Sequence, residues 1–133
     1  MGRRLAPKAM LCAALFFAAP VAAKDIAAPS VIGFEGVAMM LDEMNAYFRG
    51  RTCSGDYRRK VFFGKDGSFR DAYPDSTSEG AYTFAPGVVT VRYTGGSSKW
   101  KIGKTERLRA SRLTETGQHL LGFNTLFCGA DAR

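Results

Sequence analysis

The spacing of apolar residues changes once along this chain, from the period of a helix to the period of a strand. Apolar residues recur three or four positions apart over residues 35–48, which places them on one face of a helix. They are Val37, Met40, Leu41, Met44 and Phe48. Gly50 follows at a position suited to end a helix. From residue 51 onward apolar and polar residues alternate, so the pattern predicts one amphipathic helix followed by β-strands.

Turns that contain glycine or proline divide the alternating region into short strands about ten residues apart. The turn at residues 64–67, Gly-Lys-Asp-Gly, is typical of a tight hairpin, because glycine accepts the positive φ that such loops require. The predicted strands are residues 58–63, 68–73, 80–84, 88–93, 99–102, 107–113 and 120–128. We therefore expect a mainly β protein: an antiparallel meander of about 7–8 strands, curled into a small barrel or sandwich and preceded by one N-terminal amphipathic helix.

Alternation also assigns a face to each side chain in these strands. The set expected inside is Val61, Phe63, Phe69, Tyr73, Tyr82, Phe84, Val89, Val91, Tyr93, Trp100, Ile102, Leu108, Phe123 and Phe127. The cations expected outside are Arg58, Lys60, Arg70, Arg92, Lys99, Lys101, Arg107 and Arg109. The inner aromatic rings either fill a core or line a ligand cavity, and in a domain of this size we expect them to fill it.

The first 23 residues have the composition of an export signal. Three cations, Arg3, Arg4 and Lys8, precede an apolar run over residues 9–19, and small residues stand before Lys24. The run is too short to cross a bilayer, which needs about 20 residues. We expect residues 1–23 to be a signal peptide cleaved near Ala23, and the product to be periplasmic or extracellular with no membrane span.

The remaining chain divides into an arm and one domain. Residues 24–33, which contain Pro29, are interpreted as a flexible arm or linker, and residues 34–133 as a single helix-plus-β-barrel domain. Three of the 19 cations lie in the signal, so 16 cations face 12 acidic residues, a net charge of +4 after cleavage. This charge favours solubility and acidic partners, and export argues against a nucleic-acid partner.

Export also bears on how the cysteines pair. Cys12 lies within the apolar run and is removed with it. Cys53 and Cys128 remain, and an oxidising compartment favours a disulfide between them. We expect this bond to tie the start of the folded domain to its end.

The sequence offers little for catalysis or metal binding. The chain has one histidine, His119, which follows the turn at residues 114–117 and is interpreted as an exposed turn residue. One histidine and a bonded cysteine pair do not make the usual zinc site. We expect no enzymatic activity, no metal and no cofactor.

Two features are suited to binding. Outward cations from several strands can align across the sheet and attract an anionic envelope component or an acidic protein surface, although cations also protect sheets from edge pairing. An aromatic interior can enclose a ligand. The candidate binding residues are Arg58, Lys60, Arg92, Lys99, Trp100 and Lys101.

The layout resembles a known kind of envelope protein. An export signal and a helix precede Gly50-Arg51-Thr52, and a run of hairpins follows with Phe69 after the Asp66-Gly67 turn. This layout is similar to that of small lipocalin-like β-barrels of the bacterial envelope, among them metalloprotease inhibitors with a leading helix and one disulfide. Those barrels commonly have Trp where this chain has Thr52. The resemblance implies a binding barrel without chemistry of its own.

The expected function is therefore an exported, non-enzymatic binding protein of the cell envelope. In the leading version it is an inhibitor or interaction module that meets a protein partner with a barrel rim or with residues 24–33. In the alternative it carries a small hydrophobic or anionic ligand in an apolar cavity lined by Trp100, Tyr82 or Phe123. A structural envelope protein is a further alternative.

Overall fold

The computed structural model describes residues 30–34 and 36–129. The expected signal peptide and residues 24–29 of the expected arm lie outside this part. The elements are β2 (Val37–Ala38), α3 (Leu41–Tyr47), β3 (Arg51–Ser54), η2 (Asp56–Arg58), β4 (Lys60–Phe63), β5 (Ser68–Tyr73), β6 (Ser76–Ala85), β7 (Val88–Gly95), η3 (Lys99–Lys101), β8 (Thr105–Arg112), β9 (His119–Leu121) and β10 (Asn124–Leu126).

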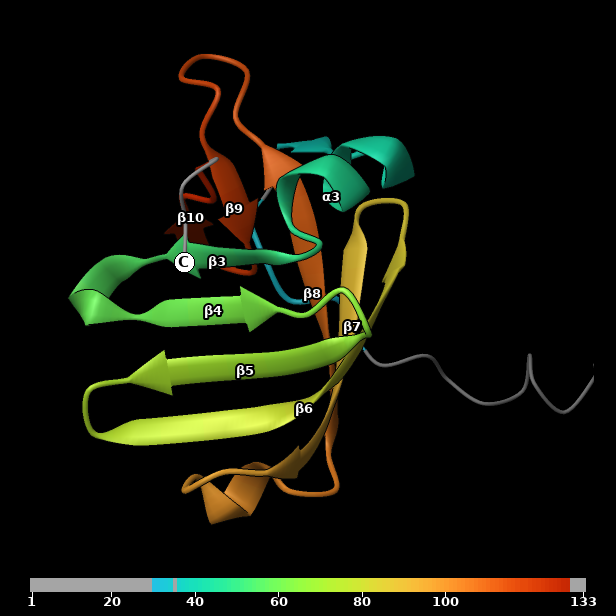
Figure 1. Cartoon of the computed structure of the whole chain (residues 1–133). Coiled ribbons are helices and arrows are strands. Elements are labelled where there is room, and N and C mark those ends of the chain that lie inside the picture. Colours follow the sequence, from blue (N-terminus) through green and yellow to red (C-terminus); the bar gives the residue numbers. More distant parts are fainter. Residues whose placement is uncertain (1–29, 35, 130–133) are drawn as a thin grey trace, which may run out of the picture.

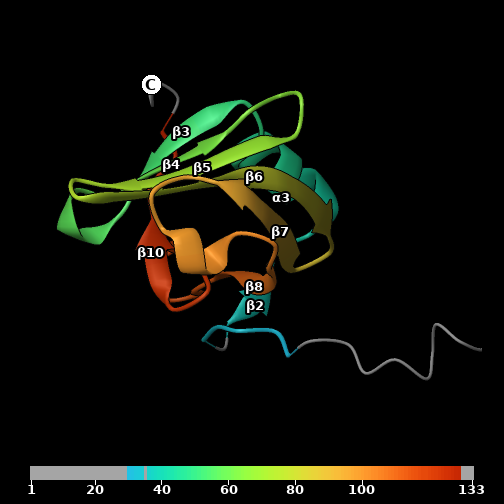
Figure 2. The same ribbon diagram turned by 90° about the horizontal axis from the view of Figure 1, so that it is seen from below.

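Strands β3 to β10 form an antiparallel meander in which each strand pairs with the next along the chain. The sheet curls on itself into a nearly closed barrel (Figure 1), with β2 added beside β8 (Figure 2). Within the described residues, no helix is long and apolar enough to cross a membrane. The expected fold class is confirmed, and the barrel is the correct choice over the sandwich.

The barrel closes where the first and last strands of the meander meet. Ser54 and Phe127 form a single bridge, with both backbone N–H···O=C bonds at 2.8 Å. Beside this bridge Cys53 and Cys128 form the predicted disulfide, which is buried and joins positions 75 residues apart. By the chain-entropy argument a loop of this length stabilises the fold by about 4–5 kcal/mol. Among the described residues this closure has one bridging residue pair, which the covalent bond supports.

The interior follows the predicted alternation along most of the sheet. The buried core includes Val61, Phe63, Phe69, Tyr82, Val89, Val91 and Tyr93, and Phe84 and Leu108 pack against it. Four residues expected inside are exposed instead, and that prediction is wrong: Trp100, Ile102, Phe123 and Phe127. They lie in a turn of helix, in loops or past the end of a strand, where a period of two no longer applies.

Two predicted strands are also corrected. Residues 99–102 were expected as a strand but form the 3₁₀ turn η3, because Ile102 N–H bonds back to the Lys99 carbonyl at 3.2 Å. Residues 120–128 form two short strands, β9 and β10, separated by a turn at Gly122. The strand expected from residue 58 begins at Lys60, and β6 begins at Ser76, within an expected loop. The bounds of β4, β6, β9 and β10 follow their pairing with neighbouring strands.

The predicted helix is too long. Residues 37–38 pair with β8, and Met39 N–H bonds to the Ala110 carbonyl at 3.0 Å, so the helix begins only at Leu41. Its buried residues are Met44 and, just past its end, Phe48, whereas Met40 points to solvent. The backbone of the expected first helical turn therefore pairs with the sheet instead, and this tertiary pairing overrides the helical spacing of the apolar residues.

The chain before the helix crosses the outer side of β8. Ile32 bonds to β8 at Arg107 and Arg109, and the chain then passes to the opposite edge of the strand at β2. At Gly33 a Cβ atom would lie 2.8 Å from the Cβ of Arg109, so glycine permits this close approach. The described end of the expected arm is thus attached to the sheet.

The two ends of the barrel are covered differently. At one end α3 packs its Phe48 ring against Phe63 and Phe84, with ring centroids 5.0 and 5.9 Å apart. At the other end the loop between β7 and β8 folds over the opening and carries η3 (Figure 2). The first end is apolar, and the second brings together most of the polar groups that enter the interior.

Candidate functional site

The six residues proposed for binding from the sequence lie in three places. Lys99, Trp100 and Lys101 stand together on η3. Arg58 and Lys60 lie at η2 and the start of β4, where Lys60 Nζ donates to Ser54 Oγ at 3.1 Å. Arg92 is exposed in the middle of β7, with Ala81 and Thr105 as its strand neighbours. The six residues thus lie on different elements, and the binding role of each remains a prediction.

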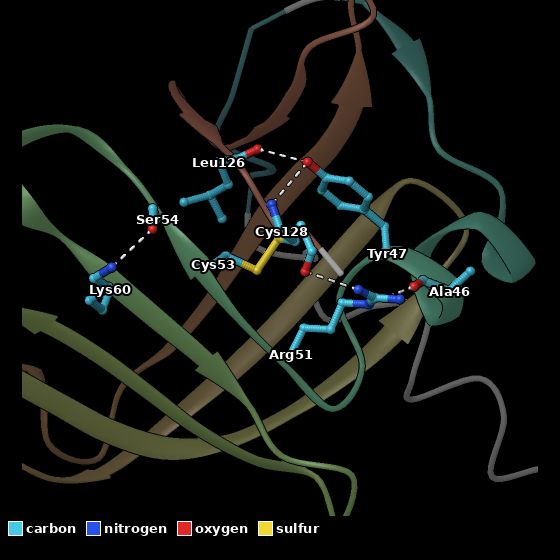
Figure 3. The surroundings of a disulfide bond; sticks show 9 residues. Ala46, Tyr47, Arg51, Cys53, Ser54, Lys60, Leu126 and Cys128 are labelled. Atoms are coloured by element: carbon cyan, nitrogen blue, oxygen red, sulfur yellow. Dashed lines mark hydrogen bonds between the residues drawn. A yellow bond between two sulfur atoms is a disulfide. The ribbon is translucent and has the colours of Figure 1, made fainter. Parts of the chain in front are cut away.

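A groove runs along the seam where β3 and β10 meet, and it has a volume of about 530 Å³. Figure 3 shows the side chains at this seam around the disulfide. The groove is lined by Tyr47, Ser54, Gly55, Asp56, Thr116, Gly117, Gln118, His119, Thr125, Leu126 and Phe127. Pockets of this size are within the range of about 300–1,000 Å³ that small ligands and short peptides occupy.

The groove exists because β3 leaves its partner after one residue pair. Beyond Ser54 the chain turns into η2, where Tyr57 and Arg58 both adopt positive φ, at 60° and 59°. Two successive non-glycine residues in the left-handed region carry backbone strain, which folds retain most often at functional sites. The turn also leaves Tyr57 85% exposed.

The departure of β3 leaves part of the β10 backbone facing the groove. The backbone N–H and C=O groups of one strand residue point to the opposite side from those of the next residue. Thr125 and Phe127 are two residues apart, so their backbone groups point to the same side. The backbone N–H and C=O of Phe127 bond to Ser54 of β3. At the position opposite Thr125 the chain has left β3, so the bridge does not continue there. In the described part of the chain, Thr125 has no backbone partner on this side.

At one end of the groove, a network of hydrogen bonds and ring stacking joins α3 to the sheet. The Tyr47 hydroxyl accepts from Cys128 N–H at 3.0 Å and donates to the Leu126 carbonyl at 3.2 Å (Figure 3). The His119 ring stacks on Tyr47 with centroids 3.8 Å apart. His119 is therefore a half-buried residue of β9, and its interpretation as an exposed turn residue is wrong.

Glu43 extends the same network from α3 to two strands. Its Oε2 atom accepts from Arg112 Nε at 2.8 Å and lies 3.3 Å from His119 Nε2. The hydrogen bond from Arg112 holds the pKa of Glu43 below its ordinary value, despite some opposition from burial. The carboxylate is thus charged at neutral pH and fixes the helix against β8 and β9.

A second candidate site lies at the η3 end of the barrel. Arg59 turns inward between its two outward neighbours and forms a bidentate pair with Asp71, at 2.8 and 2.9 Å. Both residues are 6% exposed. Burial opposes the charge of Arg59, but the hydrogen bonds and charge of Asp71 outweigh it, so the pKa of the guanidinium lies above its ordinary value. Sequence alternation at residues 58–60 placed Arg58 and Lys60 outside but drew no attention to Arg59.

A cavity of about 290 Å³ opens beside this pair. It is lined by Asp71, Tyr73, Ser76, Ser78, Ser98, Trp100 and Lys101. The Lys101 ammonium lies 4.9 Å from the centroid of the Tyr93 ring and 5.3 Å from that of Trp100. Lys101 is therefore turned toward the barrel, although alternation had placed it outside.

Tyr93 closes the inner side of this polar region. Its hydroxyl donates to Glu106 Oε1 at 2.7 Å. Burial, and after it the carboxylate of Glu106, raise the pKa of the Tyr93 phenol far above its ordinary value. The hydroxyl therefore stays protonated and remains a donor to Glu106.

Sequence reasoning missed the seam groove and the buried pair for different reasons. The groove depends on where two strands distant in sequence separate, and no local pattern reports that. The pair had a weak signal, because Asp71 lies between Phe69 and Tyr73 on the predicted inner face. A charge at an inner position needs a partner, and this requirement could have directed attention to Arg59.

Comparison with known proteins identifies no relative: no protein-family model, no curated protein and no solved structure matches this chain. Of the expected resemblance, the structure supports an eight-strand antiparallel meander nearly closed into a small barrel, and no family is identified.

Proposed function

We propose that this protein is a non-enzymatic binding protein that takes an extended segment of a partner polypeptide into the seam groove. The observation that carries the proposal is the incomplete pairing of β10, which leaves the backbone of Thr125 facing a groove of about 530 Å³. An extended peptide supplies the N–H and C=O groups that such an edge lacks, and strand addition is a common mode of peptide recognition.

Exposed aromatic side chains at this seam favour a protein partner. Phe127 lines the groove and is 67% exposed, and Tyr57 projects from η2 next to the lining residues Gly55 and Asp56. Large aromatic residues contribute most of the binding energy in many protein interfaces, and solvent exposure of such rings is costly without a partner. Backbone pairing would provide affinity, and these rings would provide selectivity.

The cell envelope is the proposed location. The disulfide is consistent with an oxidising compartment, and residues 1–23 have the composition of an export signal. Intact-mass measurement of the protein from its native host tests this part. We expect a chain that begins at Lys24 and has the mass of the oxidised form, whereas an unprocessed or reduced chain would contradict export.

A ligand carried inside the barrel is less well supported than a partner at the seam. Phe63 contacts Phe48, Phe69 and Tyr82 with ring centroids 5.0–5.5 Å apart, so these rings occupy the interior themselves. Of the three residues expected to line a carrier cavity, Trp100 and Phe123 are exposed and Tyr82 belongs to this packed cluster.

Photocrosslinking in the native host tests the seam. Benzoylphenylalanine replaces Phe127 in one variant and Phe123 in a control, since Phe123 is also an exposed aromatic residue but does not line the groove. We expect a defined partner to be crosslinked from position 127 and not from position 123. Crosslinking from both positions, or from neither, would contradict the seam as the docking site.

The crosslinked segment of the partner is then made as a synthetic peptide. We expect Phe127→Ser to weaken its binding about tenfold or more and Phe123→Ser to leave it nearly unchanged. Methylation of the peptide amides that pair with β10 is expected to abolish binding, because it removes the required N–H groups. Binding that survives methylation at every amide would exclude strand addition.

A further inference from the structure

We infer that the cavity at the η3 end of the barrel is a second, separate binding site, which takes a small organic anion with a flat apolar body. The anionic group would lie on Lys101 and the serine hydroxyls, and the apolar body on the ring of Trp100. This site shares none of its lining residues with the seam groove.

The cavity is rich in hydrogen-bond donors. Lys101 and three serines, Ser76, Ser78 and Ser98, line it. No acidic side chain of the described residues forms an ion pair with Lys101. The neighbouring carboxylates are already engaged, Asp71 by Arg59 and Glu106 by the Tyr93 hydroxyl. A ligand that brings acceptors therefore complements the cavity better than one that brings donors.

Arg59 provides independent support from behind the cavity wall. Its Nη1 atom is buried and has no hydrogen-bond partner among the described residues. The guanidinium lies against two lining residues, Asp71 and Tyr73, with its Cζ atom 5.7 Å from the Tyr73 ring centroid. Arg59 does not itself line the cavity, so it would act on an anion there through its charge and not through a direct hydrogen bond.

The loop that carries η3 is fastened in place over this cavity. Thr77 N–H donates to Ser97 Oγ at 2.9 Å, and Ser98 N–H donates to the Thr77 carbonyl at 3.0 Å. At Gly96, where φ is +107°, a Cβ atom would lie 2.5 Å from the Thr77 carbonyl oxygen, so the approach to β6 requires glycine. Lys101 and Trp100 are thus positioned before any ligand arrives, which lowers the entropy cost of binding.

Trp100 supplies both a contact and a reporter. It lines the cavity yet is 68% exposed, so one ring face is available for stacking. It is also the single tryptophan of the chain. Intrinsic fluorescence of the intact protein therefore reports on this site.

The experiment titrates the protein with benzoate and with phenyl phosphate, and uses benzyl alcohol as the neutral probe. We expect saturable quenching of Trp100 fluorescence by at least one of the two anions and much weaker binding of the alcohol. The anion that binds more tightly distinguishes a carboxylate site from a phosphate site. Absence of saturable quenching by both anions, or equal binding of the alcohol, would overturn the inference.

Two variants separate this site from general charge attraction. Lys101→Met removes the ammonium and keeps most of the aliphatic stem, and it is expected to weaken anion binding about tenfold or more. Lys99→Met, an exposed neighbour on the same turn that does not line the cavity, is expected to change binding less than about twofold. Equal losses in both variants would refute a specific site. Unchanged melting temperatures establish that both variants are folded.

Discussion

The two ends of the barrel are built from opposite kinds of side chain. At the α3 end, Phe48 enters an aromatic cluster with Phe63 and Phe84, and the Arg49 guanidinium lies 5.1 Å from the Phe84 ring centroid. At the η3 end, the interior holds the buried Arg59–Asp71 pair and a cavity lined by three serines. Burial of aromatic area stabilises a fold, whereas burial of an ion pair contributes little or opposes it.

Along the barrel axis, this difference separates the stabilising aromatic cluster from the proposed anion site. The α3 end closes the core and needs no further explanation. The η3 end contains charges whose desolvation is costly, and a shifted pKa with a charge partner beside a cavity marks a candidate binding site. Variants at the two ends should therefore behave differently: those at the apolar end should change stability alone, and those at the polar end should also change anion binding.

The largest effect is expected at the apolar end. Phe48→Ala removes a fully buried ring and is expected to lower the free energy of unfolding by about 3–5 kcal/mol, as measured by urea denaturation. Met40→Ala, which alters an exposed residue just before the same helix, should change it by less than about 0.5 kcal/mol. A small loss for Phe48→Ala would show that the aromatic cluster does not support the fold.

At the polar end, the free energy of unfolding is expected to fall when one charge of the buried pair is removed and to stay nearly unchanged when both are removed. Asp71→Asn leaves the buried Arg59 uncompensated and should lower the free energy of unfolding by about 3 kcal/mol. The double variant Arg59→Met with Asp71→Leu is expected to be close to wild type in stability, because well-packed apolar side chains often replace a buried pair without loss.

Binding should separate the double variant from the wild-type protein. If the pair serves the anion site, benzoate or phenyl phosphate binding falls in the double variant although the protein is as stable as before. Fluorescence titration and urea denaturation of the same samples measure both quantities. A double variant that is strongly destabilised and binds normally would reverse the proposed division between the two ends.

The smallest effect is a pH dependence at the α3 end. The folded-state pKa of Glu43 lies below its ordinary value of 4.5 because Arg112 donates to it. Its contribution is therefore present above about pH 4.5 and is lost as the pH falls through the folded-state pKa. Glu43→Gln should lower the free energy of unfolding by up to about 1 kcal/mol at pH 7, since the pair is partly exposed.

Denaturation of wild type and Glu43→Gln over a range of pH measures this effect. The difference between the two proteins should disappear in acid, when Glu43 of the wild-type protein is also neutral. Asp42→Asn, a neighbouring exposed carboxylate on α3, is the matched control and should stay within about 0.5 kcal/mol of wild type at pH 7. A constant difference at every pH would show that Glu43 acts through packing and not through its charge.

Local patterns in the sequence predicted much of the barrel. The Gly-Lys-Asp-Gly turn and the alternation around it predicted the β4–β5 hairpin, and β5 has the predicted bounds, Ser68–Tyr73. Alternation placed Phe63, Tyr82 and Val91 inside. These predictions hold because a hairpin and its faces depend on residues close together in the chain. The pairing of Cys53 with Cys128 followed by counting, once Cys12 was assigned to the signal.

The candidate sites could not be predicted in the same way. Alternation treated residues 99–102 as another strand, so Trp100 was expected inside and Lys101 outside, whereas the 3₁₀ turn reverses both. Met40 fitted the helical spacing but is exposed, because the backbone of the residues just before it pairs with β8. The seam groove lies where long-range pairing ends, and the η3 site lies at a loop that leaves the strand period. A local period contains no information about either.

By itself, then, the sequence determined the β class, the hairpins, most of the inward residues and the cysteine pair, because short-range periodicity and turn chemistry specify them. Only the tertiary structure decided that β3 leaves β10 after one residue pair, that Arg59 turns inward to Asp71, and that η3 closes one end of the barrel. They depend on contacts between strands and loops, from 12 residues apart for Arg59 and Asp71 to 75 residues apart for the two cysteines at the seam. Burial of charge, strand geometry and chain closure act together in these contacts.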